Sequence, residues 1–80
     1  MNLTEFAEFL VKKITTEPDM VKVKEFDTDE GLVLEVLVSE SDMGRVIGKQ
    51  GKMANSLKTI IKAKAYNDDI KNVKVNISSF

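Results

Sequence analysis

Two glycines bracket a lysine and a glutamine at Gly48-Lys49-Gln50-Gly51, and this turn is the part of the sequence best suited to hold an anion. Glycine lets the backbone turn sharply and lets a partner approach closely. Lys49 adds a mobile positive charge, and a helix predicted to begin at Lys52 directs its free N–H groups and positive dipole end at the same place. The turn therefore suits a phosphate group.

An apolar pair, Val46 and Ile47, precedes the turn and places a hydrophobic wall beside it. A polar cradle next to an apolar wall suits a nucleotide, with its phosphate on one side and its base on the other. The spacing excludes a P-loop, which needs four residues between its glycines, and a dinucleotide fingerprint, which needs Gly-x-Gly-x-x-Gly. A bare Gly-x-x-Gly also serves as a simple connection between two helices, so the spacing alone leaves both interpretations open.

Charge is distributed unevenly along the chain. The net charge is −1, but residues 43–67 contain six basic residues and no acidic one, a segment charge of +6. The remainder holds six lysines against thirteen carboxylates, a charge of −7. This asymmetry hints at a polyanionic partner. Basic residues in a helix also favour solubility and suit its C-terminal half. The asymmetry by itself therefore does not decide between a polyanion-binding surface and an ordinary solvated helix.

The composition argues against an enzyme. Histidine and cysteine are absent, which removes the commonest general base, the commonest transition-metal ligand and any disulfide or zinc-thiolate site. The carboxylates show no paired motif spacing, so we expect no catalytic residues, no metal and no cofactor. The N-terminus has no signal-peptide pattern, no stretch is long enough to span a bilayer, and we expect a cytoplasmic protein with no small-molecule substrate.

Hydrophobic periodicity divides the chain into six elements. Asn2 is a predicted cap for the first helix, which ends before Pro18. In chain order we predict a helix at 3–15, strands at 20–26 and 32–38, helices at 42–46 and 52–66, and a strand at 73–77.

This α-β-β-α-α-β order predicts a single domain over residues 1–80 of the α+β class. The short link between the first two strands predicts an antiparallel hairpin, and the helical crossover to the last strand predicts a parallel pair. A three-stranded mixed sheet with three helices packed on one face follows.

Several burial patterns follow from the same analysis. Strand 32–38 is almost wholly apolar, which is typical of a strand covered on much of both faces. Phe9 is predicted to be buried, with a surface contact for another subunit as the alternative. Tyr66 is predicted to be partly exposed, and the other phenylalanines to be core or edge residues. Lys64 falls on the apolar side of the last helix. We therefore expect either that the helix frays at this residue or that the aliphatic part of the lysine side chain extends outwards to solvent. That apolar stripe consists of Met53, Ala54, Leu57, Ile60, Ile61 and Ala65.

The segment Val46-Ile47-Gly48-Lys49-Gln50-Gly51 resembles the KH domain, whose Gly-x-x-Gly loop clamps the backbone of about four nucleotides. The element order resembles the type II arrangement. The segment Asp42–Lys52, together with the short length of the chain, makes the sequence similar to the KhpA-type family of small bacterial RNA-binding proteins. The absence of aromatic residues near the loop fits a KH domain better than a stacking platform.

The resemblance implies single-stranded RNA binding between the Gly-x-x-Gly helices and the adjacent strand. It implies that Gly48, Lys49, Gln50 and Gly51 hold the phosphates, that Val46, Ile47 and Ala54 form an apolar floor for bases, and that Arg45 and Lys52 add charge at the rim. Many KH domains have a larger aliphatic residue where Ala54 stands, which implies a shallower groove.

The resemblance further implies an RNA chaperone or post-transcriptional regulator linked to cell division, cell shape and envelope control, forming a homodimer or a heterodimer with a KhpB-type KH protein. An alternative remains open: a dimerisation or protein-interaction subunit whose RNA contact is secondary.

Overall fold

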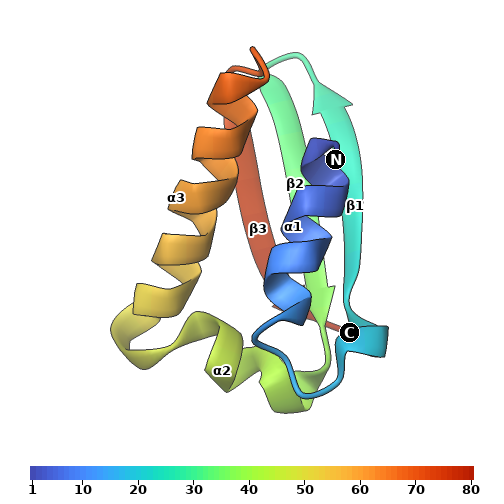
Figure 1. Ribbon diagram of the computed structural model, residues 1–80, viewed down its shortest axis with the longest axis vertical. Coiled ribbons are helices and arrows are strands. Elements are labelled where there is room, and N and C mark those ends of the chain that lie inside the picture. Colours follow the sequence, from blue (N-terminus) through green and yellow to red (C-terminus); the bar gives the residue numbers. More distant parts are fainter.

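The computed structural model describes all residues from 1 to 80 and places the predicted elements in the predicted order (Figure 1). Short 3₁₀ turns precede three of them, at Pro18–Met20, Glu40–Asp42 and Lys49–Gly51. The main elements are helix α1 (Leu3–Lys12), strands β1 (Lys22–Thr28) and β2 (Gly31–Val38), helices α2 (Met43–Ile47) and α3 (Lys52–Asn67), and strand β3 (Val73–Ser79).

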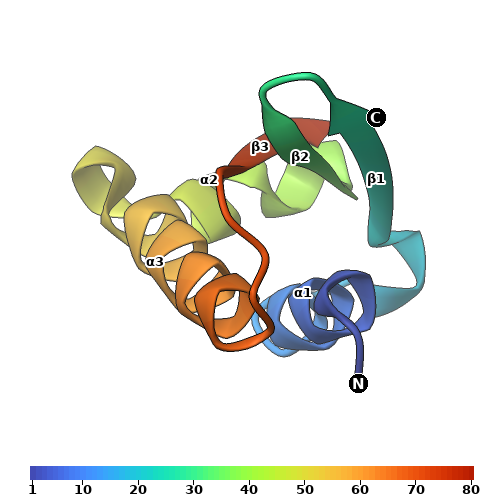
Figure 2. The same ribbon diagram turned by 90° about the horizontal axis from the view of Figure 1, so that it is seen from above.

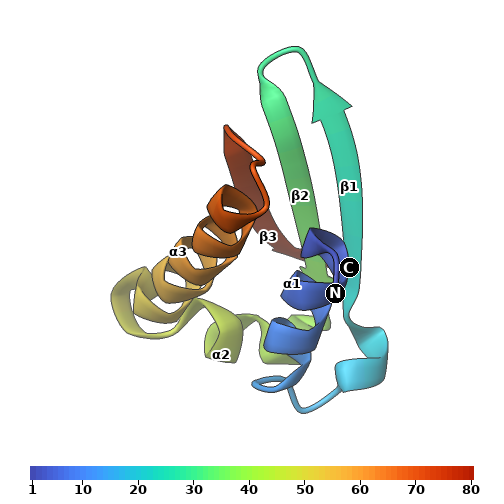
Figure 3. The same cartoon turned by 45° about the horizontal axis from the view of Figure 1, so that its top comes forward.

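The three strands form one mixed sheet in the order β1-β2-β3. Strand β1 pairs antiparallel with β2, and β2 pairs parallel with β3. The helices lie on one face of this sheet, and no element covers the other face (Figures 2 and 3). The predicted α+β class, mixed sheet and one-sided helical layer are therefore confirmed.

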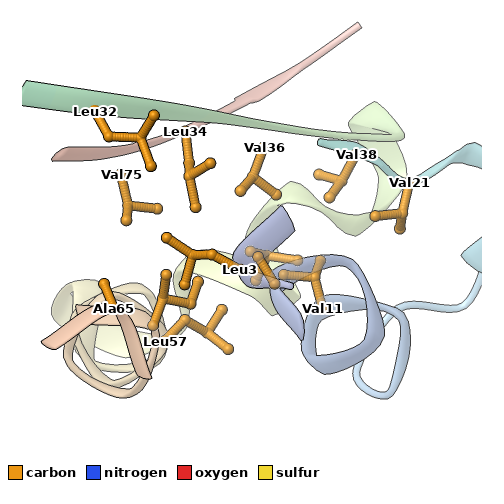
Figure 4. Close-up of a cluster of buried hydrophobic side chains, with 13 residues drawn as sticks. Leu3, Val11, Val21, Leu32, Leu34, Val36, Val38, Leu57, Ala65 and Val75 are labelled. Carbon is orange, nitrogen blue, oxygen red and sulfur yellow. The ribbon is translucent and has the colours of Figure 1, made fainter. Parts of the chain in front are cut away.

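The hydrophobic core lies between the sheet and helices α1 and α3 (Figure 4). Alternate residues of β2 point into it, because successive strand residues face opposite sides. Helix α1 contributes three buried residues and α3 another three. The core residues labelled in Figure 4 are Leu3, Val11, Val21, Leu32, Leu34, Val36, Val38, Leu57, Ala65 and Val75.

The cap predicted at the start of the first helix is present. The Asn2 side chain accepts the Glu5 N–H at 2.8 Å, and the Glu5 carboxylate accepts the Asn2 N–H at 3.1 Å, which completes a capping box. The helix ends at Lys12, three residues before the predicted limit, because the chain must turn there to reach β1.

Three burial predictions are wrong. Strand β2 is buried on one face only, because the helices pack against a single side of the sheet. Phe9 is 49% exposed, since it points away from the buried stripe of α1, and Lys13 Nζ lies 4.8 Å from its ring centroid. Met53 and Ile60 are 38% and 44% exposed, because only a narrow stripe of α3 faces the core.

Lys64, which was predicted to lie on the apolar side of its helix, forms an ion pair with a residue one turn later. Its ammonium lies 2.9 Å from an Asp68 carboxylate oxygen one turn later, and α3 continues past it to Asn67. The helix therefore does not fray at this position.

Candidate nucleic-acid interface

The Gly-x-x-Gly turn joins α2 to α3 at one end of the molecule, in the yellow-green part of the chain in Figure 1. Gly48 has φ 74° and ψ 179°, a combination that is accessible almost only to glycine. Gly51 is left-handed with φ 76° and ψ 9°. Backbone geometry therefore requires glycine at position 48 and favours it at position 51, as the sequence suggested.

Gln50 is also left-handed, with φ 56° and ψ 27°. A side chain in this region carries a local conformational cost. Two consecutive left-handed residues make the reverse bend that lets α3 begin directly after the turn. The sequence did not predict this strain, because a glutamine does not indicate a left-handed backbone.

The two glycine N–H groups are not free. Gly48 N–H donates to the Gly44 carbonyl at 2.9 Å and so closes α2, and Gly51 N–H donates to the Gly48 carbonyl at 3.3 Å. The amides of both glycines are therefore engaged within the chain rather than bare. Gly51 leaves space open, since a Cβ placed on it would meet no atom within 4 Å, whereas the Cβ position of Gly48 lies against Met53.

Cationic side chains surround the turn without internal partners. Arg45, Lys49 and Lys52 are exposed, and the two ion pairs of the structure join other residues, Lys12 with Glu8 and Lys64 with Asp68. Unpaired cations on one end of a small domain produce a positive potential there. Their charge is thus available to an anion from solution.

The apolar part of the predicted site is only partly assembled. Ile47 is 38% exposed and Ala54 is half-buried, so both can border a bound ligand. Val46 is completely buried in the core, because its side of α2 packs inward. Val46 therefore supports the turn from beneath and cannot form part of a floor for bases.

A hollow of about 410 Å³ lies beside α3 at its C-terminal half, against the loop that leads into β3. It lies at the end of α3 remote from the Gly-x-x-Gly turn, so it is not the groove that the sequence placed beside the turn, and its lining was not predicted. The lining residues are Lys62, Tyr66, Ile70, Lys71, Asn72 and Val73.

The carboxylate of Asp42 anchors the base of α2. It is 1% exposed and accepts hydrogen bonds from Thr16 N–H at 2.9 Å, Thr16 Oγ1 at 2.8 Å, Glu17 N–H at 3.0 Å and Ser39 Oγ at 3.1 Å. These bonds, led by the Thr16 N–H, lower the pKa of Asp42 below its ordinary value of 3.8 against the opposing effect of burial. Its side chain holds the α1–β1 connection against the start of α2, a role that the sequence did not predict.

The structure contains no group of three or more acidic, histidine or cysteine side chains that could hold a metal ion. None of its helices combines the length and apolar character that crossing a bilayer requires.

Comparison with known families decides the affiliation. The model of the KH domain of KhpA and KhpB matches residues 4–77. The chain belongs to this family. Its type II KH fold and its Gly-x-x-Gly turn agree with that assignment.

Curated members of the KhpA/KhpB family resemble the chain over most of its length. The RNA-binding protein KhpA of Clostridium acetobutylicum is 39% identical over 75 residues, which cover 94% of this chain and 99% of the relative. That of Clostridium perfringens is 39% identical over 69 residues, covering 86% and 92%. That of Listeria monocytogenes serovar 1/2a is 39% identical over 62 residues, covering 78% and 82%.

Proposed function

We propose that the chain acts as one KH domain over residues 1–80 and binds single-stranded RNA at the Gly-x-x-Gly turn, as a binding module rather than an enzyme. The observation that carries this proposal is the exposed Lys49-Gln50 tip, flanked by two glycines of positive φ and by the unpaired cations Arg45 and Lys52. The names of the KhpA relatives, which call them RNA-binding proteins, support it.

In this proposal the phosphates approach the Gly48–Gly51 turn over Gly51, where no side chain stands in the way, and contact the side chains of Lys49 and Gln50. The first-turn N–H groups of α3 and its positive dipole end favour the same charge. Ile47 and Ala54 border the bases. Few phosphate contacts imply modest affinity and a log–log salt slope of about −0.7 for each contact.

The experiment replaces Lys49 and Gln50 together by Asp, which sets negative charge against phosphate on an exposed tip outside the core. A charge-matched control, Lys13→Asp with Met20→Asp, makes the same change at exposed positions on the α1 side. We expect the loop variant to lose at least tenfold in affinity for a labelled five-nucleotide oligouridine, and the control to lose less than twofold. Equal binding by the folded loop variant and wild type would remove the turn as the site.

A second candidate function is self-association, or pairing with a KhpB-type KH protein, with RNA contact secondary. Its support is the exposed aromatic ring of Phe9 on α1 and the exposed Met53 and Ile60 on α3. A light-scattering mass above that of the 9.0 kDa monomer, together with no RNA retention at low salt, favours this candidate. Two weak sites in one dimer would raise avidity, so the two functions are compatible.

At the cellular level we propose a cytoplasmic role as an RNA chaperone or post-transcriptional regulator connected with cell division, cell shape and the envelope. Sequencing RNA crosslinked to the protein in cells tests this role through the transcripts that it recovers.

A further inference from the structure

The uncovered face of the sheet is positively charged, although the part of the chain outside residues 43–67 is negatively charged in total. Residues paired directly across neighbouring strands lie on the same face. The register therefore places Lys22, Lys24 and Phe26 of β1 on the side opposite the core. Lys74 of β3 lies on that side too, because it pairs with Val33.

The acids of β1 lie on the other side. Glu25 pairs with Leu34, whose side chain is in the core, and its carboxylate accepts the Thr4 hydroxyl of α1 at 2.8 Å. Asp27 pairs with the buried Leu32 and so shares that face. Strand β1 thus sorts its charges by face, which no segment-by-segment charge count reveals.

One acid, Glu35, lies on the uncovered face in the central strand. It is half-buried and accepts a hydrogen bond from Ser78 Oγ at 3.4 Å, and it makes no ion pair with Lys24, its partner across the ladder. The three lysines of the strands therefore remain unpaired and exposed, and this face carries a net charge of +2 within the sheet.

An aromatic ring completes the surface. Phe26 is 49% exposed and follows Lys24 on the same face of β1, and the half-buried Val33 separates it from Lys74 two strands away. Aromatic rings on a sheet stack with nucleic-acid bases without regard to sequence, and lysines beside them attract the phosphates. We name Lys22, Lys24, Phe26, Val33 and Lys74 the sheet platform.

Two hollows that share Asn72 in their lining lie between the platform and the α3 side. The hollow of about 410 Å³ beside α3 ends at Asn72, and a second hollow of about 230 Å³ begins at Asn72 and reaches Val33 and Lys74. Lys62 and Lys71 line the first hollow, and Lys74 lines the second, together with one acid, Glu30. Basic side chains thus mark a route from α3 around the β3 edge.

We propose that single-stranded RNA longer than the Gly-x-x-Gly site continues along this route and binds the sheet platform as a second site. The inference deepens the proposed function and rests on it. A second copy of the chain is a poorer occupant, because symmetric packing of two such faces would set each lysine cluster against its like. A 15-nucleotide strand spans about 50 Å at roughly 3.4 Å per nucleotide, which exceeds the 33 Å length of the molecule.

The experiment compares labelled oligouridines of 5 and 15 nucleotides. Lys24→Gln with Lys74→Gln removes two platform charges, and Lys12→Gln with Lys13→Gln removes two charges from α1 as the matched control. We expect the platform variant to bind the 15-mer three- to tenfold more weakly, with a log–log salt slope shallower by about 1.4, and to bind the 5-mer within twofold of wild type. Phe26→Ala is expected to weaken the 15-mer at least fivefold.

Equal 15-mer affinity and salt slope in the platform variant and the α1 control would overturn the proposal. So would a platform variant that lowers the light-scattering mass while leaving the 15-mer slope unchanged, since the face would then join copies of the chain. The loop variant at Lys49 and Gln50 separates the two claims. If that variant keeps wild-type 5-mer binding, the proposed function fails at the turn, whereas the 15-mer slope of the platform variant still decides the second site.

Discussion

The backbones of Gly31 and Asn72 touch. A Cβ on Gly31 would lie 2.1 Å from the Asn72 carbonyl oxygen and 2.7 Å from the Asn72 Cβ, and Leu32 N–H donates to that carbonyl at 3.0 Å. This contact begins the parallel β2–β3 ladder and ties the β1–β2 hairpin to the end of the helical crossover. Gly31, with φ 136°, is the residue that permits it.

Gly31→Ala is therefore expected to destabilise the fold strongly. Backbone strain at this φ costs about 1–3 kcal/mol, and displacement of the Asn72 carbonyl adds to it. Urea unfolding measures the loss. Glu30→Ala, an exposed neighbour in the same turn, is the control and is expected to stay within about 0.5 kcal/mol of wild type. Equal unfolding midpoints for the two variants would contradict the contact.

Two glycines at or near the Gly-x-x-Gly turn are expected to respond to alanine substitution in opposite directions. A Cβ on Gly48 would lie 2.7 Å from the Met53 Cβ and 2.9 Å from its nitrogen, whereas a Cβ on Gly44 would meet nothing within 4 Å. Gly48→Ala should lower the free energy of unfolding by about 1–3 kcal/mol. Gly44→Ala should raise it by about 0.5–1 kcal/mol, because alanine favours helix α2. Thermal unfolding of both variants checks the order, and a reversed order would refute the turn geometry.

Ile60 and Ile61 are neighbours on α3 with opposite environments. Ile61 is completely buried and Ile60 is 44% exposed. Ile61→Ala is expected to cost about 2–5 kcal/mol, because it leaves a cavity in the core. Ile60→Ala should cost less than about 1 kcal/mol, since nearly half of its surface already contacts water and its removal opens no enclosed cavity. Denaturant unfolding at one pH measures the free energy of unfolding of both variants. Similar losses would contradict the assignment of Ile61 to the core and of Ile60 to the exposed side of α3.

Local signals in the sequence predicted the elements, and long-range packing decided what they could not. The period of apolar residues gives element type and order because it depends on neighbours three or four positions away. Whether Ile60 or Val46 is buried depends on which elements cover a helix, and periodicity does not specify that. The two positive-φ glycines of the site were predictable, because glycine is the residue type that such geometry selects.

Two features of the site depend on distant partners and had no usable signal. The Thr16–Asp42 contact joins residues 26 positions apart. The sheet platform becomes visible only through the strand register, since Lys24 and Glu25 are adjacent in sequence but face opposite sides. A single sequence specifies such pairings only through the completed fold.

The hydrogen bonds to Asp42 predict a specific pH dependence. Because the folded-state pKa lies below the ordinary value of 3.8, the ionised carboxylate stabilises the fold above that value, and this contribution is lost as the pH falls through the folded-state pKa. Asp42→Asn cannot reproduce it, since an amide presents only one acceptor oxygen to donors that now contact both. Wild type should therefore exceed the variant in free energy of unfolding at pH 7, and the difference should shrink steadily below about pH 3.8.

Urea unfolding from pH 7 to pH 2.5 measures this difference directly, because every other carboxylate is present in both proteins. Asp19→Asn, at an exposed position outside the cluster, should follow wild type across the whole range. A constant gap between wild type and Asp42→Asn down to the lowest pH would mean that the charge of Asp42 does not hold the α1–β1 connection to α2. A gap that closes on acidification would assign the anchoring of the turn's first helix to that charge.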